Sequence, residues 1–122
     1  MLRKIGDMPE HVLGIHAVDE VRKEDIEKVL IPGLRELVDK QGAIHYLLII
    51  ETNIRNFTAG ALLQDIKAGL KYYGKWKKIA IVTDQKGVAW FSSAFRLFIP
   101  GKSKGFPLNK LDEAVIWVSA KN

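Results

Sequence analysis

Two short stretches of the chain, residues 46–50 (YLLII) and 79–82 (IAIV), are apolar at every position. A strand of this kind has no solvent-facing side, so both faces of its sheet must be covered, as in parallel α/β sheets. Helical segments follow both stretches, and strands alternating with helices favour a mostly parallel sheet with right-handed crossovers. Strands at residues 2–5 and 12–18 add an opening hairpin. The sequence therefore predicts an α/β fold with a mixed, mostly parallel sheet of about four or five strands and helices on both faces.

Apolar residues recur at helical spacing in four segments, and a helix is expected in each. Pro32 lies inside the first segment, where it removes a backbone donor and is expected to kink the helix. Residues 105–108 are expected to form at most a short edge strand. The four helices are expected from about Lys23 to Gly42, from Thr58 to about Tyr73, over residues 88–99, and from about Lys110 to Val118.

Length and composition favour one domain in a reducing compartment. The 122 residues fit a single domain spanning residues 1–122. The absence of cysteine excludes disulfides and thiolate chemistry. Residues 1–10 lack the apolar region of a signal peptide, and no apolar run approaches the roughly 20 residues of a membrane-spanning helix. We therefore expect a soluble, cytoplasmic protein.

The formal net charge is +5, which favours anionic partners or serves solubility alone. The lysines are partly clustered, because four fall within residues 71–78 and Lys102 lies close to Lys104. No segment is rich in arginine and no nucleic-acid-binding motif is present. Nucleic acid is therefore not an expected partner.

Motifs for catalysis and metal binding are absent from the sequence. His11, His16 and His45 do not form the i, i+4 pair of a helical zinc motif. No P-loop, dinucleotide-binding or nucleophile-elbow pattern occurs, and no serine has a histidine nearby in sequence. We expect no metal, no cofactor, no catalytic residue and no enzymatic activity.

Polar residues follow the two buried strands. Glu51 closes the first strand, and Thr83 and Asp84 close the second. Ligands of open α/β sheets bind beyond the carboxyl ends of the strands, so Asp84 is a candidate ligand-binding residue, with an ordinary capping role as the alternative. Two acids at adjacent strand ends also suit Mg²⁺, although no third acid is evident. Thr58 is a second candidate, because it begins a helix whose N-terminus is a generic anion site.

Residues 88–99 (VAWFSSAFRLFI) form the most apolar predicted helix. Its apolar side chains cover an arc of roughly 200°, about twice what packing on one sheet face requires. The apolar side chains that do not face the sheet must contact a neighbouring helix, another subunit, an apolar ligand or a membrane surface. The pattern leaves these four alternatives open. The candidate wall of a ligand cavity is formed by Trp90, Phe91, Phe95 and Phe98. Because basic residues beside aromatic ones suit a lipid interface, the membrane-contact candidates are Trp90, Phe91, Arg96, Lys102 and Lys104.

Several short stretches stand in a specific order: VLIPGL at 29–34, FTAGAL at 57–62, IVTD at 81–84, and LDEA at 111–114 with Trp117. From about residue 10 to 118 the chain resembles the SpoIIAA-like family, a relative of STAS domains that also resembles CRAL-TRIO-type lipid-binding domains. The resemblance implies a STAS-like fold, a non-enzymatic role and a cavity under a mobile helix. STAS phosphoswitch domains carry an Asp-Ser pair where this chain has Thr58-Ala59, which speaks against an anti-sigma-antagonist role.

Three functional hypotheses follow. The leading one is a non-enzymatic binding module for an apolar or lipid-like ligand, associating with an anionic membrane surface on its cytoplasmic side. The alternative is a STAS-type protein-interaction switch, with a second copy of the chain among its candidate partners. The third is an enzyme that uses Asp84 and Glu51.

Overall fold

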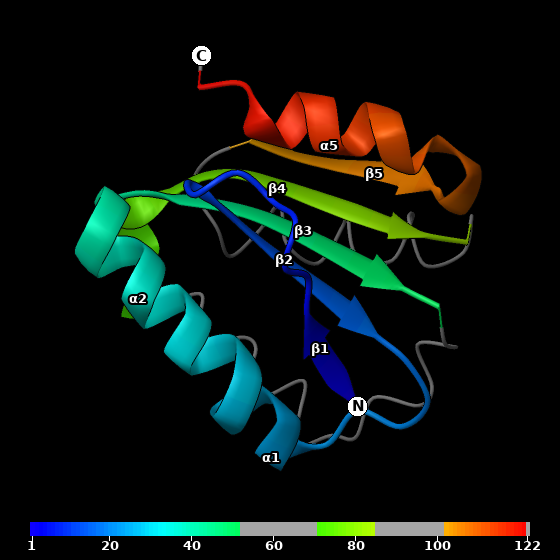
Figure 1. Cartoon of the computed structure of the whole chain (residues 1–122), viewed down its shortest axis with the longest axis horizontal. Coiled ribbons are helices and arrows are strands. Elements are labelled where there is room, and N and C mark those ends of the chain that lie inside the picture. The colour runs from blue at the N-terminus through cyan, green and yellow to red at the C-terminus, as the bar shows by residue number, and fades with distance from the viewer. Residues whose placement is uncertain (52–70, 85–101, 122) are drawn as a thin grey trace.

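The computed structural model of the protein describes residues 1–51, 71–84 and 102–121. They build a five-stranded sheet in the order β1-β2-β3-β4-β5 (Figure 1). β1 pairs antiparallel with β2, and every other neighbouring pair is parallel. This confirms the predicted mixed, mostly parallel sheet. The strands are β1 (Leu2–Lys4), β2 (Val12–Ala17), β3 (Ile44–Ile50), β4 (Trp76–Thr83) and β5 (Lys102–Pro107).

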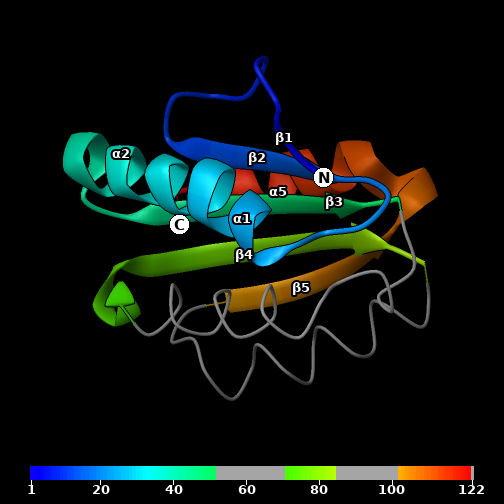
Figure 2. The same ribbon diagram turned by 90° about the horizontal axis from the view of Figure 1, so that it is seen from below.

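The longer described helices cover opposite faces of this sheet (Figure 2). Helix α2 (Ile31–Gln41) packs on one face and α5 (Leu111–Ser119) on the other. The predicted cover on both faces is thereby confirmed. The helices predicted from Thr58 and over residues 88–99 lie outside the described residues. The shorter helical pieces are α1 (Lys23–Asp25), a π-helical turn (Ile26–Leu30) and 3₁₀ turns at Tyr73–Lys75 and Leu108–Lys110.

The proline in the first helical segment coincides with a change of helix type. The N–H of Ile31 donates to the carbonyl of Ile26, five residues back, which closes the π-helical turn. Pro32 follows as one of the first residues of α2, where its missing N–H breaks no hydrogen bond of the α-helix. Gly42 ends α2 in the left-handed region at φ 71°, as predicted.

Every residue of β3 is buried, because its alternating side chains enter two different cores. Tyr46, Leu48 and Ile50 pack towards α2. Leu47 and Ile49 pack towards α5. The uninterrupted apolar run in the sequence is thus the signature of a strand that lies between two layers of helix.

The prediction for the last strand was too short. β5 begins at Lys102 rather than at Gly105, and it pairs in parallel with β4. Exposed Lys102 and Lys104 interrupt any apolar pattern, and only Phe106 of this strand is buried. Charged side chains on an edge strand hinder its pairing with other protein chains. The two lysines of β5 are therefore compatible with a strand at the edge of the sheet.

The end of α5 is tied to the sheet by basic side chains. His11 Nε2 donates to Ser119 O at 2.7 Å and His45 Nδ1 donates to Val118 O at 2.7 Å. Lys78 Nζ donates to Trp117 O at 2.9 Å. Carbonyls in the last turn of a helix lack intrahelical partners, and positive groups are favoured beside them.

We expect the stability of the protein to fall as pH is lowered from about 7.5 to about 5.5. Burial lowers the pKa of His45 below its ordinary value of 6.5, although the hydrogen bond to Val118 opposes this. The unfolded chain therefore binds the proton more readily, and stability is lost as pH falls below the unfolded value. Urea unfolding should show a smaller loss in His45→Gln, which keeps an amide donor. The same loss in both proteins would contradict this account.

Candidate functional site

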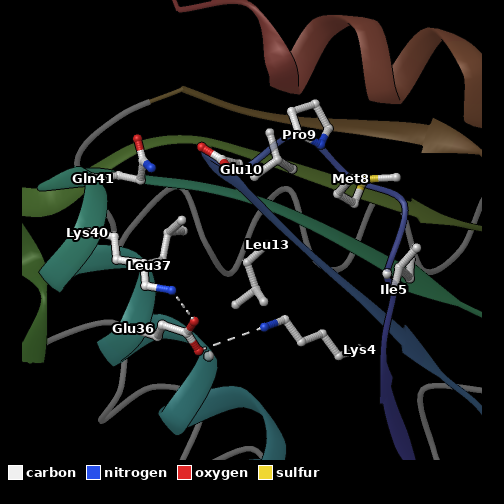
Figure 3. A pocket seen from close by; sticks show the side chains of 13 residues that line it. Lys4, Ile5, Met8, Pro9, Glu10, Leu13, Glu36, Leu37, Lys40 and Gln41 are labelled. Carbon is white, nitrogen blue, oxygen red and sulfur yellow. Dashed lines mark hydrogen bonds and ion pairs between the residues drawn. The ribbon is translucent and has the colours of Figure 1, made fainter.

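A cavity of about 420 Å³ lies between helix α2 and residues 5–10, which connect β1 to β2 (Figure 3). Its apolar lining includes Met8, Leu13 and Leu37. Binding pockets for small molecules typically occupy about 300–1,000 Å³ and are mostly apolar with a few polar groups. This cavity has the size of such a pocket, and its lining is shared between apolar and polar side chains.

Ion pairs form one rim of the cavity (Figure 3). Lys40 Nζ lies 2.8 Å from Glu36 Oε1, and Lys4 Nζ lies 4.0 Å from Glu36 Oε2. The hydrogen bond from Lys40 lowers the pKa of the Glu36 carboxyl, which keeps it charged. All three side chains are well exposed, so the pairs are easily exchanged for water or for the polar group of a ligand.

Two glycines let the walls of the cavity approach closely. A Cβ on Gly14 would lie 2.8 Å from Met8 Cγ and 3.2 Å from Ile5 Cβ, so the 5–10 segment packs directly on the backbone of β2. Ile5 N also donates to Gly14 O at 2.8 Å. On the opposite wall, a Cβ on Gly33 of α2 would meet the Leu13 side chain at 3.1 Å. A side chain at Gly14 would therefore displace the segment that closes the cavity.

A second cleft, of about 490 Å³, lies between the other side of the 5–8 segment and α5. Its lining is mainly apolar and includes Ile5, Met8, Leu111 and Val115. Ile116 borders it with 72% of its surface exposed. The cleft thus adjoins a large apolar side chain on the outer surface of α5.

The carboxyl ends of the strands carry the predicted acidic residues. His16 Nε2 lies 2.9 Å from Glu51 Oε1, within ion-pair range but without the alignment of a hydrogen bond. Asp84 is exposed and follows β4, which pairs with β3. Within the described part of the chain, no three histidine, aspartate or glutamate side chains converge to hold a metal ion. The candidate roles of Asp84 and Glu51 stay predictions.

The aromatic wall predicted from the sequence is not tested by the structure. Thr58, Arg96 and the four aromatic candidates Trp90, Phe91, Phe95 and Phe98 lie outside the described residues. Lys102 and Lys104 are exposed on β5, and Lys104 Nζ lies 5.2 Å from the centre of the Phe106 ring. Among residues 1–51, 71–84 and 102–121, no helix has the length and apolarity needed to cross a membrane.

Sequence reasoning missed the cavity beside α2. The signal available was Gly14, because an isolated glycine within a strand marks a close approach of other backbone. Nothing local indicated that residues 5–10 would fold over that glycine. The packing of residues 5–10 on Gly14 depends on the hairpin that β1 forms with the carboxyl half of β2.

Comparison with known proteins gives a family and a fold. The SpoIIAA-like family model matches residues 12–119. The structure is similar to the crystal structure of an uncharacterised protein with a SpoIIAA-like fold from Shewanella loihica PV-4. The TM-score is 0.71 at 23% sequence identity, covering 96% of this chain and 93% of the other. No curated protein gives a significant match. Because the family model covers most of the sequence, the chain belongs to the SpoIIAA-like family.

Proposed function

We propose that the protein is a non-enzymatic binding domain that takes up an amphipathic small molecule in the cavity between α2 and residues 5–10. The observation that carries the proposal is a lining of mixed character, in which the apolar side chains of Met8, Leu13 and Leu37 lie beside an ionic rim. An apolar chain fits the lining by the hydrophobic effect. A charged head group fits the rim, where it exchanges with the loose contact between Lys4 and Glu36.

The chemistry of the lining supports binding rather than catalysis. Among the described residues that line the cavity there is no histidine, serine, threonine or tyrosine, so these residues offer neither the usual general base nor a hydroxyl nucleophile. The hydrogen bond from Lys40 to Glu36 raises the pKa of Lys40 and lowers the pKa of Glu36. Both groups are therefore held in their charged forms. A proton-transfer catalyst needs a pKa near the working pH instead.

A protein-interaction role is the second candidate, and it is compatible with membership of the SpoIIAA-like family. Exposed Ile116 and the apolar cleft beside α5 are the observations that favour it. Exposed apolar patches of this kind mark interaction sites. A second copy of the chain is a suitable partner, because a two-fold interface brings the same patch together from both subunits.

The ligand proposal predicts that filling the cavity blocks binding. Gly6 lines the cavity, and a Cβ at this position has no heavy atom within 4 Å, so Gly6→Leu begins its side chain in open space. Decanoate should bind the unmodified protein in calorimetry, and Gly6→Leu should weaken binding by about tenfold or more. Gly74→Leu is the matched control, because Gly74 has equally open surroundings outside the cavity. Equal affinities in all three proteins, or no binding to any, would rule out this cavity as the site.

The interaction candidate predicts a concentration-dependent dimer in light scattering after size exclusion. Replacing Ile116 by lysine puts a charge at the border of the apolar cleft beside α5, so the dimer should dissociate at least about tenfold more readily. Ile116→Ala should have a smaller effect. A monomer at all concentrations would remove the homodimer from consideration.

Membrane association is a further part of the proposal, and it depends on the predicted helix over residues 88–99. Vesicle co-sedimentation should increase with the fraction of anionic lipid and decrease with salt, because basic side chains are attracted to anionic head groups. Trp90→Ala and Phe91→Ala should weaken binding, since aromatic insertion adds to that attraction. Protein that stays in the supernatant with anionic vesicles at low salt would disprove membrane association.

A further inference from the structure

A second region of the molecule gathers positive charge around a cavity of about 520 Å³. It lies at the amino ends of β3 and β4 and the start of β5, beside the last turn of α5. Gln41, Ala43 and Trp76 contribute to the lining, and none of the described lining residues is acidic. The basic lining residues are His11, His45, Lys77, Lys78, Lys102 and Lys121.

The register of the sheet produces this concentration of charge. Lys78 of β4 pairs with His45 of β3 on one side and with Lys102 of β5 on the other, so three basic residues form a row across three strands. The register between β3 and β4 shifts between Ile44 and His45, which leaves Lys77 as the extra residue of a bulge. Bulges redirect side chains and are common next to functional sites.

The basic residues repel one another in the absence of a partner. Basic groups directly opposite each other on neighbouring strands are destabilising when charged. The positive charges of His11, Lys78 and Lys121 each lower the pKa of His45, after the larger effect of burial. The ring centres of His11 and His45 are only 5.0 Å apart.

Lys78 is the most deeply buried lysine of the cavity, and no acidic side chain among the described residues pairs with it. Only 6% of the Lys78 surface is exposed. The contacts of Lys78 Nζ are the Trp117 carbonyl at 2.9 Å and the Trp117 ring at 5.0 Å. Within the described residues, no carboxylate forms an ion pair with a lysine of this cavity. Buried charge without an opposite charge is costly, and a bound anion would remove that cost.

We propose that this basic cavity is a binding site for a phosphoryl group. A phosphate ester offers several oxygens and about two negative charges, which match several converging ammonium groups. Trp76 lines the same cavity and provides an apolar surface for the organic part of the ligand. The site is independent of the amphipathic cavity, although Gln41 borders both. The phosphoryl group belongs either to a soluble ester or to a lipid head group.

Calorimetry with pyrophosphate at low salt tests the site. The double variant Lys77→Gln, Lys102→Gln removes two exposed cavity lysines and leaves the buried hydrogen bonds of Lys78 and His45 in place. Pyrophosphate should bind the unmodified protein and bind this variant about tenfold or more weakly. Lys28→Gln, Lys71→Gln is the matched control, because it removes the same charge from exposed positions outside the cavity. Its affinity should change by less than about twofold.

Vesicles distinguish the two sources of phosphate. Phosphatidylcholine vesicles with and without phosphatidic acid are sedimented with each protein, with and without pyrophosphate. Binding to phosphatidic acid that the cavity variant loses and pyrophosphate competes away identifies a lipid head group. Pyrophosphate binding without vesicle binding identifies a soluble ester. Equal weakening in the cavity and control variants, or no binding of either probe, overturns the proposal, provided the variants unfold in urea at the same midpoint as the unmodified protein.

Discussion

The structure depends on covering both faces of a parallel sheet. β3 is buried along its whole length, and its side chains alternate between a core under α2 and a core under α5. A strand in this position tolerates no charged residue in its middle, because a polar group there would lose its water without gaining a partner. The polar chemistry of the protein is therefore displaced to the ends of the strands and to the connections between them.

The two ends of the sheet differ in charge. At the carboxyl ends, Glu51 and Asp84 follow β3 and β4, and Glu51 lies beside His16. At the amino ends, the row of His45, Lys78 and Lys102 crosses three strands. Two members of that row also hold the last carbonyls of α5. The same side chains thus attach a helix and line a basic cavity, so an anion bound there would be coupled to the packing of α5.

The amphipathic cavity has a different origin. β1 pairs only with the carboxyl half of β2, so the amino half of β2 is free to be covered by residues 5–10. Glycine at position 14 permits that cover at van der Waals contact, and the segment then separates the cavity beside α2 from the cleft beside α5. A single connection therefore shapes two candidate interaction sites. Ile5 and Met8 line both sites. A ligand in the cavity beside α2 and a protein bound at the cleft beside α5 would therefore contact the same two residues.

The sequence by itself determined that helices cover both faces of the sheet, that most strands are parallel, that the first helix ends at Gly42 and which family the chain belongs to. These features depend on local patterns: apolar runs, helical spacing and a glycine that adopts φ 71°. Only the tertiary structure decided where β5 begins, how residues 5–10 enclose a cavity, and which cations converge. The reason is physical, since these features arise from strand register and from contacts between distant residues. His11 and Ser119 are separated by 108 positions and hydrogen-bond at 2.7 Å, and no local pattern encodes that proximity.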